Sequence, residues 1–205
     1  MKVVFDFGGV LFRWRPPELL KRELPLRATD DASAARWVND FFQGYEGDWG
    51  EFDRGALDER EIAERIAART GLSLIEARRV IDAVPTELQP MPASISLLHR
   101  LRGADTPLYF LSNMPAVYAD HLEAEHDFIG WFRAGLFSSR VKLIKPEPAI
   151  FELAARHFEA APEELLFFDD HPVNVRAAAL AGWDAVHFTD AAAAEEALRS
   201  RGLLD

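Results

Sequence analysis

Between residues 91 and 205, short apolar runs alternate with stretches that carry a helical pattern, and this alternation constrains the fold more than any other feature of the sequence. Strands separated by helices form parallel sheets whose two faces the helices cover. A further apolar run near the start suits a strand buried on both faces. We therefore predict an α/β fold, a Rossmann-like parallel sheet with helices on both faces. The expected strands are Val3–Phe5, Leu108–Leu111, Leu136–Phe137, Leu165–Phe168 and Ala185–Phe188.

Helices alone are expected between residues 14 and 90. Asp58 with Glu61 and Ser73 with Glu76 have the spacing of capping boxes, and Gly71 has the position of a helix end. We predict an all-helical cap over residues 14–90, inserted into a core formed by residues 1–13 and 91–205. In the core, we also expect a helix from Pro146 to Phe158. Apolar residues at helical spacing are interpreted as the cap interior; they are Trp37, Val38, Phe41, Phe42 and Tyr45.

The composition excludes several classes of function. The chain of 205 residues has no cysteine, which rules out disulfides and thiolate chemistry. Its formal net charge of −11 disfavours nucleic acid and anionic membranes as partners, and a phosphate site in so acidic a chain requires a local cation. No apolar run reaches the length of a membrane span and no signal peptide precedes the first strand, so we expect a cytoplasmic protein. Nothing in the sequence sets its oligomeric state.

Polar side chains follow several of the predicted strands. Asp6 follows the first strand, the Ser112-Asn113 pair follows the second, and the Asp169-Asp170 pair follows the fourth. Lys145 lies in a loop that leads to a predicted helix. The carboxyl ends of parallel strands meet at one edge of the sheet, where ligands bind. These carboxylates, with one hydroxyl, one amide and one ammonium group, can hold a divalent metal, a phosphoryl group and a nucleophile.

Four motifs at these positions resemble those of a known family. In chain order they are FDFGGVL (Phe5–Leu11), LSN (Leu111–Asn113), KPEPAIF (Lys145–Phe151) and FFDDHPVNVRAAALAGW (Phe167–Trp183). The chain resembles the haloacid dehalogenase superfamily of hydrolases, in which four such motifs occur in this order. The resemblance covers the whole chain, because the helical cap of that family lies where residues 14–90 lie here.

The resemblance implies catalytic and substrate-binding roles. Asp6 would attack phosphorus and carry an aspartyl-phosphate intermediate. Lys145 would bind both this nucleophile and the phosphoryl oxygens. The Ser112 hydroxyl and the backbone N–H of Asn113 would hold phosphate oxygens. The implied activity is hydrolysis of a small phosphorylated metabolite.

The resemblance also implies a Mg²⁺ site. Asp6, the backbone carbonyl of Gly8 and Asp170 would bind the metal, and Asp169 would bind it through water or orient Lys145. Gly8 is the main departure from the family pattern, because phosphatases of this family usually have an aspartate there that acts as general acid and base. Some members with glycine at this position, which resemble this chain in FDFGGVL and FFDD, act on sugar phosphates such as a hexose 1-phosphate.

Two alternatives to a phosphatase stay open. A 2-haloacid dehalogenase shares the fold and the nucleophile but does not use a metal, so the Asp169-Asp170 pair argues against it. A non-catalytic binding protein is disfavoured because the other motif residues are all present. Trp14, Tyr45 and Trp49 are expected to reach a substrate under the closed cap. We interpret His171 as an exposed loop residue, and Asn174 as a helix-capping residue with a supporting role.

Overall fold

The computed structural model describes residues 1–204 and contains a five-stranded sheet whose neighbouring strands are all parallel. The strands are β1 (Lys2–Phe5), β2 (Leu108–Ser112), β3 (Ala134–Phe137), β4 (Leu165–Asp169) and β5 (Asp184–His187). Their spatial order is β3-β2-β1-β4-β5, so β1 is central. Phe5 lies opposite Phe110 on one side and Phe168 on the other. The predicted α/β fold is confirmed, and the ends of β1, β2 and β4 share one edge of the sheet.

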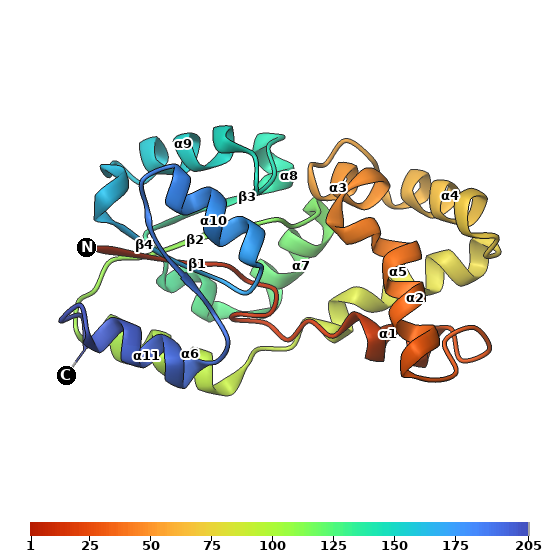
Figure 1. Ribbon diagram of the computed structural model, residues 1–205, viewed down its shortest axis with the longest axis horizontal. Coiled ribbons are helices and arrows are strands. Elements are labelled where there is room, and N and C mark those ends of the chain that lie inside the picture. The colour runs from red at the N-terminus through yellow and green to blue at the C-terminus, as the bar shows by residue number, and fades with distance from the viewer. Residues whose placement is uncertain (205) are drawn as a thin grey trace.

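Helices cover both faces of the sheet (Figure 1). Because successive strand residues point to opposite faces, Phe5 and Phe168 pack in one apolar cluster while Val4 and Phe167 pack in another. Among the helices after residue 90, three contribute to the first cluster, namely α6 (Pro92–Gly103), α7 (Ala116–Glu125) and α11 (Ala191–Arg199). Two contribute to the second, namely α9 (Pro148–His157) and α10 (Pro172–Leu180). Short helical turns complete the core at η2 (Asp127–Trp131), α8 (Ser138–Val141) and η3 (Pro162–Glu164).

The remaining helices lie together to one side of the sheet (Figure 1). They are α1 (Pro16–Glu23), α2 (Asp31–Phe42), η1 (Gln43–Tyr45), α3 (Gly47–Asp53), α4 (Glu59–Thr70) and α5 (Leu74–Glu87). Capping boxes begin α4 at Asp58 and α5 at Ser73, and Gly71 ends α4 with a φ of 74°, as predicted. Every strand of residues 1–204 lies outside this helical segment. The division into a core and a cap at these boundaries stays a prediction.

The two chain segments that lead into and out of the helical segment run beside each other. The backbone N–H of Arg13 donates to the carbonyl of Gln89 at 2.8 Å. The backbone N–H of Met91 donates to the carbonyl of Leu11, also at 2.8 Å. The two chain connections between the helical segment and the rest of the protein therefore lie side by side.

The helix expected from Pro146 begins two residues later, at Pro148, so that boundary was wrong. Glu147 has extended backbone angles, and its N–H donates to the carbonyl of Ile144 at 2.9 Å, which closes a turn. Proline at the first position of α9 then starts the helix. Lys145 therefore lies in a turn at the edge of the sheet.

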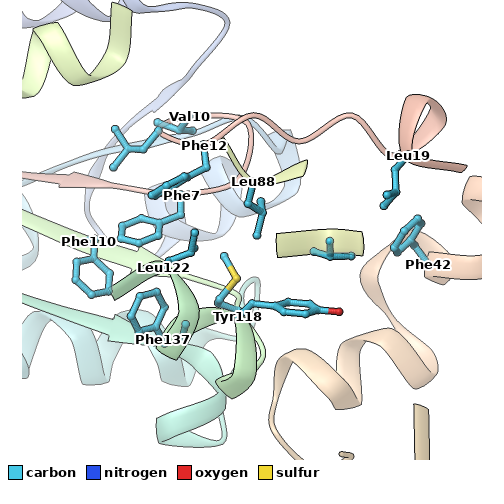
Figure 2. Close-up of a cluster of buried hydrophobic side chains, with 14 of the residues drawn as sticks. Phe7, Val10, Phe12, Leu19, Phe42, Leu88, Phe110, Tyr118, Leu122 and Phe137 are labelled. Atoms are coloured by element: carbon cyan, nitrogen blue, oxygen red, sulfur yellow. The ribbon is translucent and has the colours of Figure 1, made fainter. Parts of the chain in front are cut away.

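Aromatic packing fixes the turn that follows β1. The ring centroid of Phe7 lies 5.2 Å from that of Phe12, 4.7 Å from that of Phe110 and 5.3 Å from that of Phe137. Figure 2 shows these rings together, with Tyr118 extending from the core toward the helices that carry Leu19 and Phe42. One continuous apolar cluster thus joins the sheet to the helical segment. Within residues 1–204, no helix is long and apolar enough to cross a membrane.

Candidate active site

A buried lysine joins two carboxylates at the end of the sheet. Lys145 Nζ lies 2.9 Å from Asp6 Oδ1 and 2.6 Å from Asp169 Oδ2, and all three residues are buried. Burial alone would lower the pKa of Lys145, but the charges of Asp169 and Asp6 outweigh it and raise the pKa. The lysine is therefore held as a cation. It supplies the local positive charge that an anionic ligand requires in this acidic chain.

Asp169 is fixed by groups from the start of α10. The backbone N–H of His171 donates to Asp169 Oδ1 at 2.8 Å. Asn174 Nδ2 lies 3.1 Å from each of the two carboxylate oxygens of Asp169. With Lys145 also bound, the carboxylate of Asp169 is saturated by the protein, which agrees better with orienting Lys145 than with binding a metal directly. Asn174 thus positions an acidic residue, a contact that the expected helix-capping role does not include.

Three carboxylates are close enough to share a divalent cation. Asp6, Asp169 and Asp170 each offer one oxygen, and these oxygens lie within 4.8 Å of one another. Such an oxygen-only set fits Mg²⁺, which keeps several waters and needs few protein ligands. In the metal-free protein, burial raises the pKa of Asp6 to about 7, with Lys145 opposing and Asp169 and Asp170 adding to the shift. Burial, and then the charge of Asp169, raises the pKa of Asp170 to about 6. A bound cation would relieve this crowding.

The two glycines after Asp6 have different environments. Gly9 has a φ of +71°, and a Cβ there would overlap the carboxylate of Asp170, so no larger residue fits without displacing it. Gly8 has no such restriction, because its nearest neighbour to an added Cβ would be Trp14 Cβ at 3.9 Å. Gly8 lines the same cavity as Asp6, and its carbonyl as a metal ligand stays a prediction.

The end of β2 supplies the expected hydroxyl and amide. Ser112 is buried, and its Oγ has no hydrogen-bond partner within residues 1–204. An unpaired buried hydroxyl is unfavourable unless a ligand pairs with it, as a phosphate oxygen would. The Asn113 side chain is already occupied, because Oδ1 accepts from the Lys145 N–H at 2.8 Å and Nδ2 donates to the Lys145 carbonyl at 2.9 Å. Its backbone N–H as a phosphate donor stays a prediction.

A cavity of about 200 Å³ opens between this cluster and the helical segment. Trp14, Tyr45 and Trp49 line it, as expected. His171 also lines the cavity and is half-buried, with its ring edge-on to Tyr45 at a centroid distance of 6.2 Å, so the expectation of an exposed loop residue was wrong. The apolar part of the lining is Trp14, Tyr45, Trp49, Val84, Leu88, Met114, Tyr118, Ile144 and Val173. By contrast, the cap-interior residues Phe41 and Phe42 are fully buried away from it.

Asp53 is a cavity residue that the sequence patterns do not single out. It is the last residue of α3, is only 4% exposed and lines the cavity together with Asp6 and Lys145. Burial raises the pKa of Asp53 well above its usual value; the charge of Asp6 adds to the shift and that of Lys145 opposes it. The only feature of the sequence that could have indicated Asp53 as a site residue is its position as an acidic residue in an aromatic part of the helical segment, close to Trp49 and Phe52.

Comparison with known proteins agrees with this geometry. A family model described as haloacid dehalogenase-like hydrolase matches residues 3–182. The chain belongs to this family of hydrolases. The match spans the predicted nucleophile and the acidic pair, and the parallel sheet is that expected for the family. The family resemblance read from the motifs is therefore confirmed.

Three similar proteins place this hydrolase among its relatives. It is 26% identical over 191 residues to the sesquiterpene phosphatase astK of Aspergillus oryzae, covering 93% of this chain and 90% of the relative. Its fold is similar to that of a HAD family enzyme, bt-2542, of Bacteroides thetaiotaomicron in complex with magnesium and inorganic phosphate (TM-score 0.70, 20% identity, 90% and 92% of the two chains). It is also similar to the L-2-haloacid dehalogenase RSc1362 (TM-score 0.67, 22% identity, 89% and 83%). The fold is thus similar both to an enzyme solved with magnesium and phosphate and to a dehalogenase, so fold similarity alone does not select between the two chemistries.

Proposed function

We propose that this hydrolase is a Mg²⁺-dependent phosphatase that acts on the monophosphate of a small alcohol. The observation that carries the proposal is a cluster in which the buried Lys145 pairs with Asp6 and Asp169, the Asp170 carboxylate lies beside theirs, and a cavity opens at Asp6, Lys145 and Asp170. A dehalogenase of this family has no metal for an acidic pair to hold, so the position of Asp170 beside Asp6 favours the phosphatase. The phosphatase relative covers nearly the whole chain and supports the same choice.

In the proposed reaction, Asp6 is the nucleophile. Lys145 engages Oδ1 of Asp6, which leaves Oδ2 to form a bond with phosphorus while the ester bond breaks. The Ser112 hydroxyl and the Asn113 N–H would hold phosphoryl oxygens. Asp6, Asp170 and the Gly8 carbonyl would hold Mg²⁺, which supplies charge neutralisation when bound. Water then attacks phosphorus, releases phosphate and restores the carboxylate of Asp6.

The cavity walls favour an apolar alcohol over a sugar. The indole N–H of Trp14 donates to the Tyr45 hydroxyl at 2.8 Å, and the Tyr118 hydroxyl donates to the carbonyl of Ile81 at 2.9 Å. The Trp14 indole proton and the Tyr118 hydroxyl proton are therefore already used within the protein and are not free to bind a substrate hydroxyl. A sugar hydroxyl that lost water here without a new partner would cost about 1–3 kcal/mol. We propose a terpenoid or similar apolar alcohol, in keeping with the sesquiterpene phosphatase relative, in preference to the hexose 1-phosphate suggested by the family pattern.

A matched pair of esters tests this proposal. Cyclohexylmethyl phosphate and glucose 6-phosphate both release a primary alkoxide next to a six-membered ring, but only the sugar carries ring hydroxyls. Two unpaired hydroxyls correspond to about 10²-fold in kcat/KM in favour of the cyclohexyl ester. Farnesyl phosphate and glucose 1-phosphate extend the comparison. A preference for either sugar phosphate would contradict the apolar assignment.

The chemistry is tested separately from the substrate. Activity on p-nitrophenyl phosphate should disappear with excess chelator, return with Mg²⁺ and be absent in Asp6→Asn, whose fold is checked by circular dichroism. Release of chloride from 2-chloropropionate in the presence of chelator would instead support the dehalogenase. Full phosphatase activity in Asp6→Asn would show that the nucleophile is misassigned. If no ester and no haloacid is turned over, the remaining hypothesis is a non-catalytic binding protein.

A further inference from the structure

The position two residues after the nucleophile carries no acid. Gly8 has no side chain, although the space beside it would accept one. An alkoxide is a poor leaving group, and proton donation to it typically raises the rate by about 10²–10⁴-fold. A phosphatase that acts on alkyl esters therefore needs a proton donor from another part of the chain.

Asp53 has the placement of such a donor. It reaches the cavity from the cap side, whereas Asp6, Lys145 and Asp170 reach it from the core side. It is 4% exposed, and its carboxyl group has no hydrogen-bond or ion-pair partner within residues 1–204. A buried carboxyl group without a partner is unfavourable unless it serves a ligand. The other acidic residue of the cap that lines the cavity, Glu46, is exposed.

The backbone around Asp53 is anchored to the core. The Asp53 carbonyl accepts a hydrogen bond from Ser138 Oγ at 2.6 Å, directly after β3. Arg54 Nη1 donates to Glu147 Oε2 at 2.9 Å, and Lys142 Nζ donates to the Gly55 carbonyl at 2.5 Å. The position of Asp53 is therefore set by the same core that holds the nucleophile. This is the precision that proton transfer in an active site requires.

The surroundings favour the protonated form of this carboxyl group. Burial disfavours the carboxylate, and the negative charge of Asp6 disfavours it further, so the pKa of Asp53 is raised well above its usual range despite Lys145. A carboxyl group whose protonated form is favoured in this way is suited to give its proton to a developing alkoxide.

We infer that Asp53 is the catalytic acid that replaces the one missing at Gly8. This rests on the proposed phosphatase function. As Asp6 forms its bond to phosphorus and the ester P–O bond breaks, the carboxyl proton of Asp53 passes to the leaving oxygen and the alcohol departs. When water attacks the phosphorus of the aspartyl phosphate, its proton passes to the Asp53 carboxylate. Asp6 and the protonated Asp53 are both restored, and inorganic phosphate leaves.

Dependence on the leaving group separates this role from simple substrate binding. The probe esters are p-nitrophenyl phosphate, whose leaving group needs no proton, and cyclohexylmethyl phosphate, whose leaving group does. In Asp53→Asn, kcat/KM, which reports the steps up to departure of the alcohol and excludes the later hydrolysis of the aspartyl phosphate, should fall about 10²–10⁴-fold on the alkyl ester and less than about tenfold on the aryl ester. Asp53→Ser, which replaces the carboxyl group by a hydroxyl instead of an amide, should show the same larger loss on the alkyl ester. Asp40→Asn, an exposed cap residue with the same chemical change, is the control and should match the wild type on both esters.

An equal loss of kcat/KM on the two esters in Asp53→Asn and Asp53→Ser would overturn the inference and make Asp53 a binding or structural residue. Adding Gly8→Asp to Asp53→Asn should restore kcat/KM on the alkyl ester at least tenfold, since a Cβ added at Gly8 would meet nothing closer than Trp14 Cβ at 3.9 Å. No recovery in a folded double variant would also count against a proton-donor role. Wild-type protein that hydrolyses neither ester would instead refute the phosphatase proposal itself, which keeps the two failures distinct.

Discussion

Removing the buried cation of the site is predicted to destabilise the metal-free protein strongly. Lys145→Met keeps the length of the side chain but leaves Asp6 and Asp169 without the ammonium group that lies 2.9 and 2.6 Å from their oxygens. Breaking a buried ion pair on one side costs about 3–5 kcal/mol, because a charge stays buried without its partner. For a chain of 205 residues, 1 kcal/mol corresponds to about 2–4 °C in Tm, so Tm should fall by about 6–20 °C.

The assay is urea unfolding in the presence of chelator at pH 8 and at pH 5. Protonation of Asp6, whose pKa is raised to about 7, should reduce the loss in Lys145→Met at the lower pH. Lys21→Met is the control, because Lys21 pairs with Glu18 and Asp31 at the surface, and its midpoint should hardly change. A loss below about 1 kcal/mol at pH 8, or an equal loss at both pH values, would refute the reasoning from buried charge.

Two further predictions follow from the cavity and its carboxylates. Without metal, the pKa values of Asp6 and Asp170 are raised to about 7 and 6 in the folded protein, so it binds more protons than the unfolded chain between about pH 4 and 7. Its Tm should therefore fall as pH rises from 5 to 8. The fall should be smaller in Asp6→Asn, which lacks one of the two carboxyl groups. An equal pH dependence in the two proteins would contradict this. Tyr45→Phe, which removes the acceptor of the Trp14 indole N–H, should change the ranking of alkyl esters more than turnover of acetyl phosphate. Uniform losses would count against a selectivity role.

Local patterns were sufficient to predict the sheet and the residues at its edge. Polar residues follow three of the predicted strands, and a parallel sheet brings those ends together whatever the details of packing. Asp6, Asp169 and Asp170 were therefore predictable as neighbours, as the distances between their oxygens confirm. Lys145 lies in a loop, and the family motif rather than a strand end predicted its place beside Asp6 and Asp169. Helix starts with capping boxes could also be predicted from the sequence, because a capping box depends on two residues three positions apart.

Features that depend on contacts across the fold were not predictable. Asp53 lines the same cavity as Asp6, and its carbonyl is bound by Ser138, 85 residues later in the chain. His171 is partly covered because η1 of the cap brings Tyr45 against it. α9 begins at Pro148 and not at the predicted Pro146, because the Glu147 N–H closes a turn before the helix. Neither the helix and strand propensities of the residues nor the spacing of the motifs predicts these contacts.

The paired segments at Arg13–Gln89 and Leu11–Met91 also have an evolutionary consequence. A segment whose two ends are hydrogen-bonded to each other can lengthen, shorten or be exchanged without pulling on Asp6. Recombination could therefore exchange this segment and leave Asp6, the proposed nucleophile, unchanged. Exchange of this segment would also remove Asp53, the proposed proton donor, so Asp53 limits which exchanges preserve activity on alkyl esters. A lineage that exchanged it would retain alkyl-ester chemistry only by regaining an acid, and Gly8 is the position with room for one.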